Sequence, residues 1–143
     1  MRELYPYVKV PLNYELLQNM NHNIPLPDNE RERLEALINF NILEKMPEHE
    51  LLPLIKLAAF VSQTSVAVLS IIEGKRHYIK SKIGLSVYDM QNDFDFCHLV
   101  VQSNDYVEIP DAMKDPEFNM NPMVVGHPNF RFFGGVPIAT KEG

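Results

Sequence analysis

The sequence VEIPDAMKDPEFNMNPMVVGHPNFRFFGGVPI, residues 107–138, guides our interpretation of the whole chain. It begins as a short apolar strand at residues 107–109 and ends as an aromatic and β-branched strand at residues 130–139. The loop between them, residues 111–129, has about twenty residues, and such long connections in a compact domain are usually functional or disordered. It holds large apolar residues that a disordered tether lacks: Met113, Phe118, Met120, Met123, Val124 and Val125. We therefore expect the loop to fold back over a sheet and close a pocket.

Length and composition are typical of one soluble domain. The chain has 143 residues, of which 45% are hydrophobic and 22% charged, as in ordinary globular proteins. Its net charge of −6 disfavours a nucleic-acid partner. No run approaches the roughly 18 apolar residues of a membrane helix, and the N-terminus lacks the apolar core of a signal peptide. We expect a cytoplasmic domain without membrane contact.

The first half of the chain predicts an extension followed by two helices. Residues 1–28 hold four prolines and are interpreted as a linker, a packed extension or a segment that pairs with a second subunit. Asn29 and Glu32 have the spacing of a capping box, and an apolar stripe follows it at helical spacing: Leu34, Leu37, Ile38 and Ile42. Either Pro47 or Pro53 opens a second helix, which we expect to be largely buried.

Strand patterns dominate the second half. Residues 66–72 form an apolar strand, Gly74 supplies the turn, and residues 76–82 alternate between two faces, with His77, Ile79 and Ser81 together. A short helix is expected at residues 94–102, before the strand at residues 107–109. Helices and strands in this order predict an α+β domain with an antiparallel sheet flanked by helices.

Several segments together resemble a bacterial GAF domain, of the subtype found N-terminal to sensor histidine kinases and diguanylate cyclases. The resemblance covers residues 29–143. In the loop and the strand after it, the matching residues are Asp111-Ala112, Asp115 to Phe118, Asn121-Pro122, Val124, Gly126, Pro128, Arg131 to Phe133 and Gly135 to Pro137. Upstream, the matches are Asn29-Glu30, Arg33-Leu34, Ile42-Leu43, Lys80 to Lys82, Gly84-Leu85 and Phe96-Cys97.

This resemblance implies a GAF-like, PAS-related fold. In that family a long central strand and a C-terminal helix follow the position of residues 141–143. Since neither is present here, we expect a GAF domain at residues 29–143 that is incomplete at its C-terminus. Either the chain is a fragment, or a dimer fills the empty strand position by exchange.

The resemblance further implies a sensory or regulatory domain of a signal-transduction protein, such as a two-component system. It would bind a small ligand, form a homodimer, or both, and so control an output module. We expect this domain itself not to be an enzyme, with a kinase or cyclase as the output, and the cofactor is left open. The candidate ligand-binding residues are Tyr78, Cys97, His98, Asp111, Asn121, Arg131 and Phe133.

Each candidate also has an ordinary structural interpretation. Cys97 is either a small buried side chain, a bilin anchor or a redox nucleophile. Asp111 either caps the residues after it or contacts ligand, and Asn121 fixes an Asn-Pro turn. Arg131, if it points inward, must pair with Asp111, Asp115 or an acidic ligand.

Three other functions remain open. The first is a ligand-free dimerisation module whose pocket is filled by Phe118, Met120 and Met123. The second is an enzyme of the methionine-sulfoxide reductase type, which shares the GAF fold and would use Cys97. The third is a chromophore-bearing photosensor. No two histidines have the spacing of metal ligands, so we expect no metal site.

Overall fold

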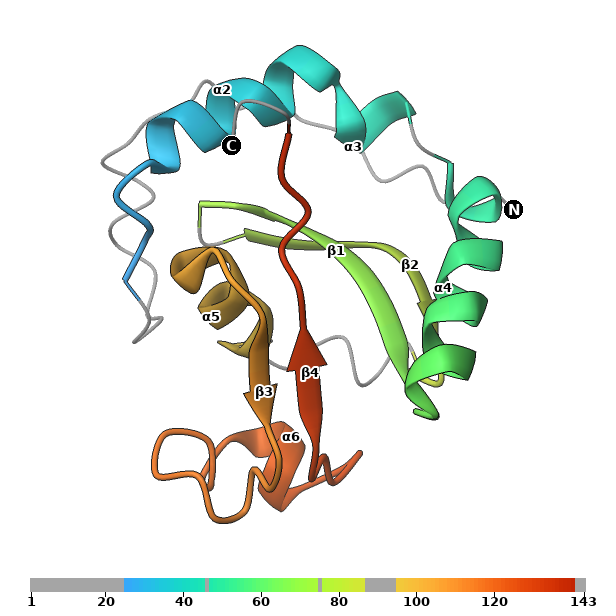
Figure 1. The fold of residues 1–143 in the computed structure, drawn as a ribbon, viewed down its shortest axis with the longest axis vertical. Coiled ribbons are helices and arrows are strands. Elements are labelled where there is room, and N and C mark those ends of the chain that lie inside the picture. Colours follow the sequence, from blue (N-terminus) through green and yellow to red (C-terminus); the bar gives the residue numbers. More distant parts are fainter. Residues whose placement is uncertain (1–24, 46, 75, 87–94, 141–143) are drawn as a thin grey trace.

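The computed structural model describes residues 25–45, 47–74, 76–86 and 95–140. Their helices and strands follow the order α2 (Glu30–Phe40), α3 (Ile42–Lys45), α4 (Glu48–Ser62), β1 (Ala67–Glu73), β2 (Arg76–Ile83), α5 (Asp95–Ser103), β3 (Val107–Ile109), α6 (Pro122–Val125) and β4 (Phe133–Gly135) (Figure 1). The α+β class is confirmed. Most of the predicted N-terminal extension lies outside the described residues.

The described strands form two separate two-stranded sheets, β1–β2 and β3–β4, both antiparallel. The predicted antiparallel pairing is therefore confirmed, and the GAF-like arrangement of these strands around an empty central position stays a prediction. β4 is also shorter than the predicted strand, because backbone groups before it bind the loop instead. The Phe130 N–H donates to the Met123 carbonyl at 2.8 Å, and the Arg131 carbonyl accepts from the Ala112 N–H at 2.6 Å.

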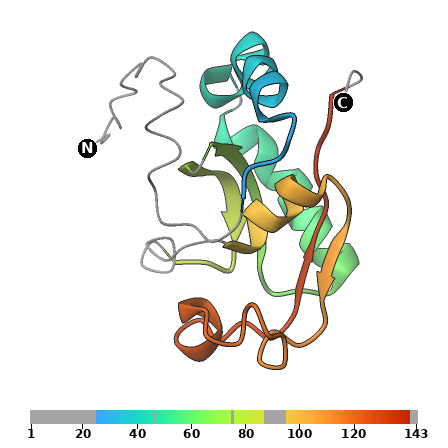
Figure 2. The ribbon, with the colours of Figure 1, turned by 90° about the vertical axis from the view of Figure 1, so that its left-hand side faces the viewer.

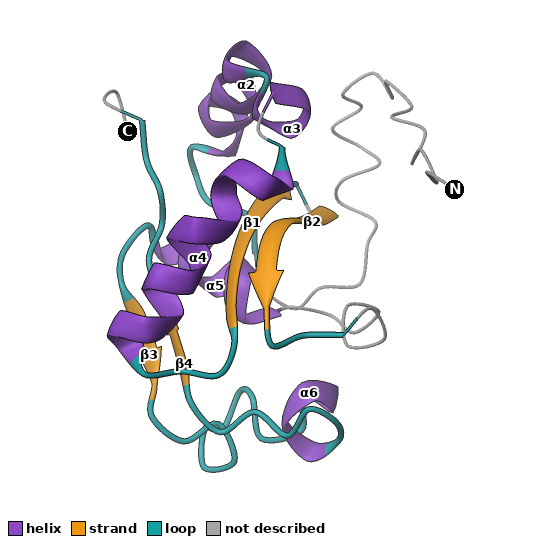
Figure 3. Ribbon diagram, turned by 90° about the vertical axis from the view of Figure 1, so that its right-hand side faces the viewer, coloured by secondary structure: helices purple, strands orange, loops and turns teal. Residues whose placement is uncertain are grey.

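Helices α2 and α3 lie at one end of the molecule, and the loop with α6 lies at the opposite end, with the strands between them (Figures 1 and 2). The β1–β2 hairpin turns at Gly74, whose φ of 59° is in the left-handed region, as the sequence predicts. This hairpin separates α4 on one face from α5 on the other (Figures 1 and 3).

Helix α4 packs on the hairpin through one narrow stripe, formed by Leu51, Ile55 and Ala59. Our prediction that this helix is largely buried is wrong, because the sheet covers only one side of it. The opposite side exposes large apolar residues, namely Leu54, Leu57, Phe60 and Val61. The helix begins after Pro47, and Pro53 lies inside it rather than at its start.

Helix α2 differs from its prediction at both ends. Asn29 makes no side-chain capping hydrogen bond, so the predicted capping box does not form. Asn41 adopts the left-handed conformation with φ 49° and separates α2 from α3. Of the predicted apolar stripe, Leu34 is buried while Ile38 is half exposed.

A β-bulge changes which residues of β2 share a face. Ser81 pairs with Leu69 and Ile79 pairs with Ser70, with a register shift between Leu69 and Ser70. Paired residues point to the same side of a sheet, and neighbours along a strand point to opposite sides. Ser81 therefore lies on the face opposite Ile79, and the predicted strict alternation of residues 76–82 is wrong beyond the bulge.

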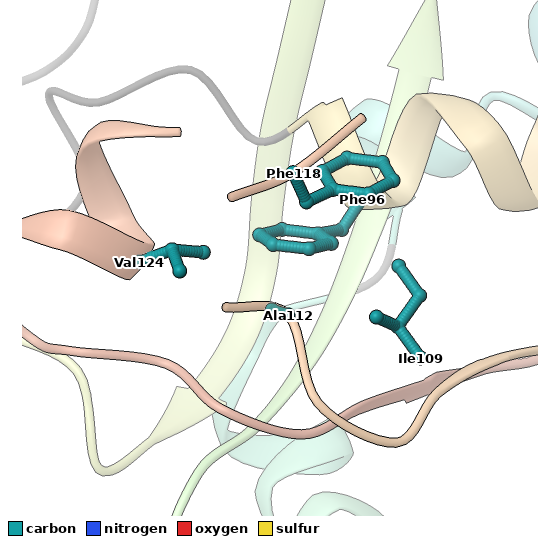
Figure 4. Close-up of a cluster of buried hydrophobic side chains, with 5 residues drawn as sticks. All are labelled: Phe96, Ile109, Ala112, Phe118 and Val124. Atoms are coloured by element: carbon teal, nitrogen blue, oxygen red, sulfur yellow. The ribbon is translucent and has the colours of Figure 1, made fainter. Parts of the chain in front are cut away.

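The loop at residues 111–129 folds back on α5 and builds a core with it. Five buried residues from α5, β3, the loop and α6 form this core (Figure 4): Phe96, Ile109, Ala112, Phe118 and Val124. Of the other apolar loop residues, Met123 is buried, whereas Met113, Met120 and Val125 are exposed. The loop thus fills its own interior with side chains.

Candidate functional site

The face of the β1–β2 hairpin that looks toward α5 carries the candidate site. Most side chains between this face and α5 are apolar, with a few polar groups among them. We call this set the α5 layer; its members are Val66, Val68, Ser70, His77, Ile79, Leu85, Cys97, His98, Met123 and Phe130. Two of the predicted site residues, Cys97 and His98, belong to it.

Gly84 brings Leu85 into the layer. Its φ is 74°, a left-handed conformation, and a Cβ at this position would lie only 2.0 Å from the Ser65 carbonyl oxygen. Glycine is therefore required both by the backbone conformation and by the close approach of another chain segment. The Lys82 ammonium group donates to the Leu85 carbonyl at 2.9 Å and helps to fix this turn.

Cys97 is a half-buried residue of the layer. Burial raises its pKa from 9.0 to about 11, and a hydrogen bond with the Ser70 side chain opposes this shift. The thiolate is the nucleophilic form of cysteine, so at neutral pH very little of Cys97 is reactive. These features favour the interpretation of Cys97 as a small buried side chain over a redox nucleophile.

His77 and His98 face each other across the layer, one on β2 and one on α5. Their ring centroids are 6.3 Å apart, and His98 is buried. Burial lowers the pKa of His77 from 6.5 to about 4, and the neighbouring His98 charge adds to this effect. His77 is therefore neutral at physiological pH and offers one donor and one acceptor nitrogen to its surroundings.

Asn121 supports the layer from the loop side. It is the N-cap of α6, and its side-chain oxygen accepts from the Met123 N–H at 2.9 Å. This confirms that Asn121 fixes the Asn-Pro turn. The cap positions Met123, which is fully buried in the layer.

Tyr78 lies away from the layer. It pairs with Ile71, whereas its neighbour Ile79 faces α5, so its side chain projects from the other face of the hairpin. There its hydroxyl donates to the Glu73 carboxylate at 3.0 Å. The structure does not bring Tyr78 together with Cys97 and His98.

Asp111 and Arg131 also lie outside the layer. Asp111 accepts from the Met113 N–H at 3.1 Å and pairs with Lys114 at 2.9 Å, which confirms its capping role. Lys114 lowers the pKa of the Asp111 carboxyl group. Arg131 is exposed and donates to the Val124 and Phe130 carbonyls, both at 2.9 Å, so it needs no acidic ligand to satisfy it.

The aromatic residues of the last strand divide between core and surface. Phe133 packs on the loop core, stacked on Phe96 with ring centroids 5.0 Å apart. Phe130 contacts both the loop core and the α5 layer, and Phe132 is half exposed. Phe133 is thus a core residue next to the candidate site.

Sequence reasoning missed His77 and Ser70 as members of the layer. Histidine pairs were expected only at the short spacing of metal ligands. His77 and His98 are too far apart in sequence to fit that pattern. The available signal was the position of His77 on the same strand face as the apolar Ile79.

Among the described residues, no three histidine, cysteine, aspartate or glutamate side chains lie close enough to hold a metal ion. Over the same residues, no helix combines the length and apolar character needed to span a bilayer.

No protein-family model matches the sequence. The chain is, however, 31% identical over 119 residues to the cyclic di-GMP phosphodiesterase PA2567 of Pseudomonas aeruginosa. The match covers 83% of this chain and 20% of the relative, so the chain spans about a fifth of the length of the protein it matches. It is therefore similar to one segment of a larger bacterial phosphodiesterase.

This similarity corrects one prediction. We expected that the chain is not an enzyme, and the relative that it matches is an enzyme. The expected output module was a kinase or a cyclase, whereas the relative is named as a phosphodiesterase.

Proposed function

We propose that the chain is a segment of a bacterial enzyme of cyclic di-GMP turnover, and that it serves this enzyme as a GAF-type sensory unit. The observation that carries the proposal is the 31% identity over 119 residues to one segment of a cyclic di-GMP phosphodiesterase. The GAF-like order of motifs supports the sensory part of the proposal, because such units bind small ligands or form dimers.

In this proposal the α5 layer is where a small ligand acts. Ser70, His77 and His98 place hydrogen-bonding groups among apolar side chains, a combination typical of small-molecule sites. The ligand would bind a conformation in which α5 and the loop have moved from the hairpin. It would thereby shift the population of conformations and the geometry of a homodimer.

A ligand-free dimerisation module is the second candidate. The burial of Phe118 and Met123 favours it, because these side chains occupy the interior that a ligand would enter. Met120, which we expected to join them, is 79% exposed. Thermal unfolding in the presence of candidate metabolites separates the two: a raised melting temperature with any metabolite supports the ligand-binding unit.

A chimera tests the main proposal. The matched segment of the Pseudomonas aeruginosa enzyme is replaced by this chain, and hydrolysis of cyclic di-GMP is followed by liquid chromatography. We expect the chimera to hydrolyse cyclic di-GMP. Replacing His98 by Leu in the chimera should change the rate severalfold, while the exposed His49→Gln control should not.

Two results would count against the proposal. One is a chimera without hydrolysis although it is folded and the parent enzyme is active. The other is a chimera whose rate is the same with His98→Leu, with His49→Gln and after deletion of the whole segment.

A further inference from the structure

Burial of helix α2 is greatest near its N-terminal end. Of the eleven residues of α2, all of which are described, only Glu30 and Leu34 are buried. Toward the other end, Ile38 and Phe40 are 54% and 53% exposed. The polar contacts near the start of α2 therefore contribute most to fixing its position on the hairpin.

Glu30 and Arg33 make those contacts, and we call this pair the α2 clasp. The two carboxylate oxygens of Glu30 accept from Arg33 Nε at 2.6 Å and from Nη2 at 2.8 Å. The remaining Arg33 nitrogen, Nη1, donates to the Ile72 carbonyl at 2.5 Å, and the Gly74 N–H donates to Glu30 at 3.1 Å. The clasp therefore joins α2 to the end of β1 through the Ile72 carbonyl, and to the hairpin turn through the Gly74 N–H.

Ile72, whose carbonyl the clasp binds, is the strand partner of a residue of the α5 layer. Ile72 pairs with His77 across the hairpin, and the His77 ring lies 6.3 Å from the ring of His98 on α5. His98, His77, Ile72 and Arg33 thus form a series of neighbours that runs from α5 through the hairpin to α2.

A second ion pair on the same helix is exposed. Arg31 and Glu35 are 3.1 Å apart, with side chains 76% and 60% exposed. The clasp is instead buried, with exposures of 20% for the Arg33 side chain and 5% for the Glu30 side chain. Burying charged groups costs free energy. Apolar residues at the same two positions often give a folded state that is at least as stable. This cost points to a role beyond simple attachment.

We propose that the α2 clasp is the joint that couples the position of helix α2 to the state of the α5 layer. Its biological role rests on the proposed function, in which a small ligand acts at the α5 layer. The coupling itself needs neither ligand nor cyclic di-GMP, so its test can fail or succeed independently of the chimera.

Hydrogen exchange of the whole chain, measured by mass spectrometry, tests the joint through a double-mutant cycle. His98→Leu disturbs the α5 layer, Arg33→Met opens the clasp, and Arg31→Met is the matched control on the same helix. Amides of residues 34–41 report on α2, and those of α4 report on the overall fold.

Arg33→Met alone should accelerate exchange in α2 by about a hundredfold, the effect of removing one partner of a buried ion pair. His98→Leu should change α2 exchange severalfold when the clasp is intact, and also in the Arg31→Met background. In the Arg33→Met background the same His98 substitution should leave α2 exchange unchanged. This loss of coupling is the expected signature of a joint.

The proposal is overturned if His98→Leu leaves α2 exchange unchanged in the otherwise wild-type chain. It is also overturned if the effect is the same size with the clasp open. Where Arg33→Met accelerates exchange in α4 as well, Arg33→Lys replaces it. Lysine keeps the charge but lacks the planar fork that reaches Glu30 and the Ile72 carbonyl together.

Discussion

The rings of Phe96 and Phe118 stack with their centroids 4.4 Å apart and an angle of 17° between their planes. Phe96 lies on α5 and Phe118 lies in the middle of the loop at residues 111–129 (Figure 4). Both side chains are almost fully buried. The loop and helix α5, which carries part of the candidate site, therefore share one core. Separating them would break the packing of both.

Replacing Phe118 by Ala should lower the free energy of unfolding by about 3–5 kcal/mol, because the change removes a buried ring and leaves a cavity. Urea unfolding followed by circular dichroism measures this loss. Met120→Ala is the matched control in the same loop, since Met120 is 79% exposed, and it should change stability by less than about 0.5 kcal/mol. Equal losses in the two variants would contradict this assignment of the loop core.

Cys97 should react slowly with alkylating reagents in the folded chain. Burial raises its pKa from 9.0 to about 11, so the thiolate fraction near neutral pH is about a hundredfold lower than in the unfolded chain. Alkylation by iodoacetamide, followed by mass spectrometry with and without urea, measures the difference. Fast labelling of the folded chain would instead favour a reactive nucleophile.

The stability of the folded chain should also fall as the pH rises from about 9 to about 11. In this window the unfolded chain releases the Cys97 proton while the folded chain retains it, so the folded state binds more protons. Cys97→Ala should remove this part of the pH dependence, which urea unfolding at both ends of the window measures.

His77 should make the protein less stable in mild acid. Its pKa is lowered from 6.5 to about 4, so between these values the unfolded chain binds a proton that the folded chain does not. The free energy of unfolding therefore falls as the pH drops from about 6.5 to about 4. His77→Gln should flatten this dependence in urea unfolding, and the exposed His49→Gln should retain it. The same slope in both variants would exclude His77 as its source.

Several local patterns in the sequence predicted local structure, although the capping box at Asn29 does not form. The turn at Gly74, the strand at residues 107–109 and the caps at Asp111 and Asn121 each depend on neighbouring residues. The chemistry of turns and caps acts over a few residues, so the sequence alone contains it.

Features that depend on distant segments were not predicted. The apolar composition of α4 suggested a buried helix, but the sheet covers only its Leu51, Ile55 and Ala59 side. Strand alternation placed Ser81 on the wrong face, because the bulge arises only when β1 and β2 pair. His77 and His98 become neighbours because α5 packs on the β1–β2 hairpin, and no spacing along the chain indicates this.

Gly84→Ala tests the geometry that delivers Leu85 to the α5 layer. Alanine at this position meets two obstacles, a φ of 74° and a Cβ placed 2.0 Å from the Ser65 carbonyl oxygen. Both the strain of a left-handed residue and the backbone clash act against the folded state, so we expect a loss of at least about 2 kcal/mol in the free energy of unfolding.

Gly134→Ala is the matched control. Its Cβ would lie 3.3 Å from the ring of the half-exposed Phe132, which can move aside, and 3.6 Å from the Tyr106 hydroxyl, an ordinary van der Waals distance. Its loss should therefore stay below about 1 kcal/mol. Urea unfolding measures both losses. If Gly84→Ala lowered the free energy of unfolding no more than Gly134→Ala, the turn at Gly84 would not be packed against Ser65, and this turn would not explain the position of Leu85 in the layer.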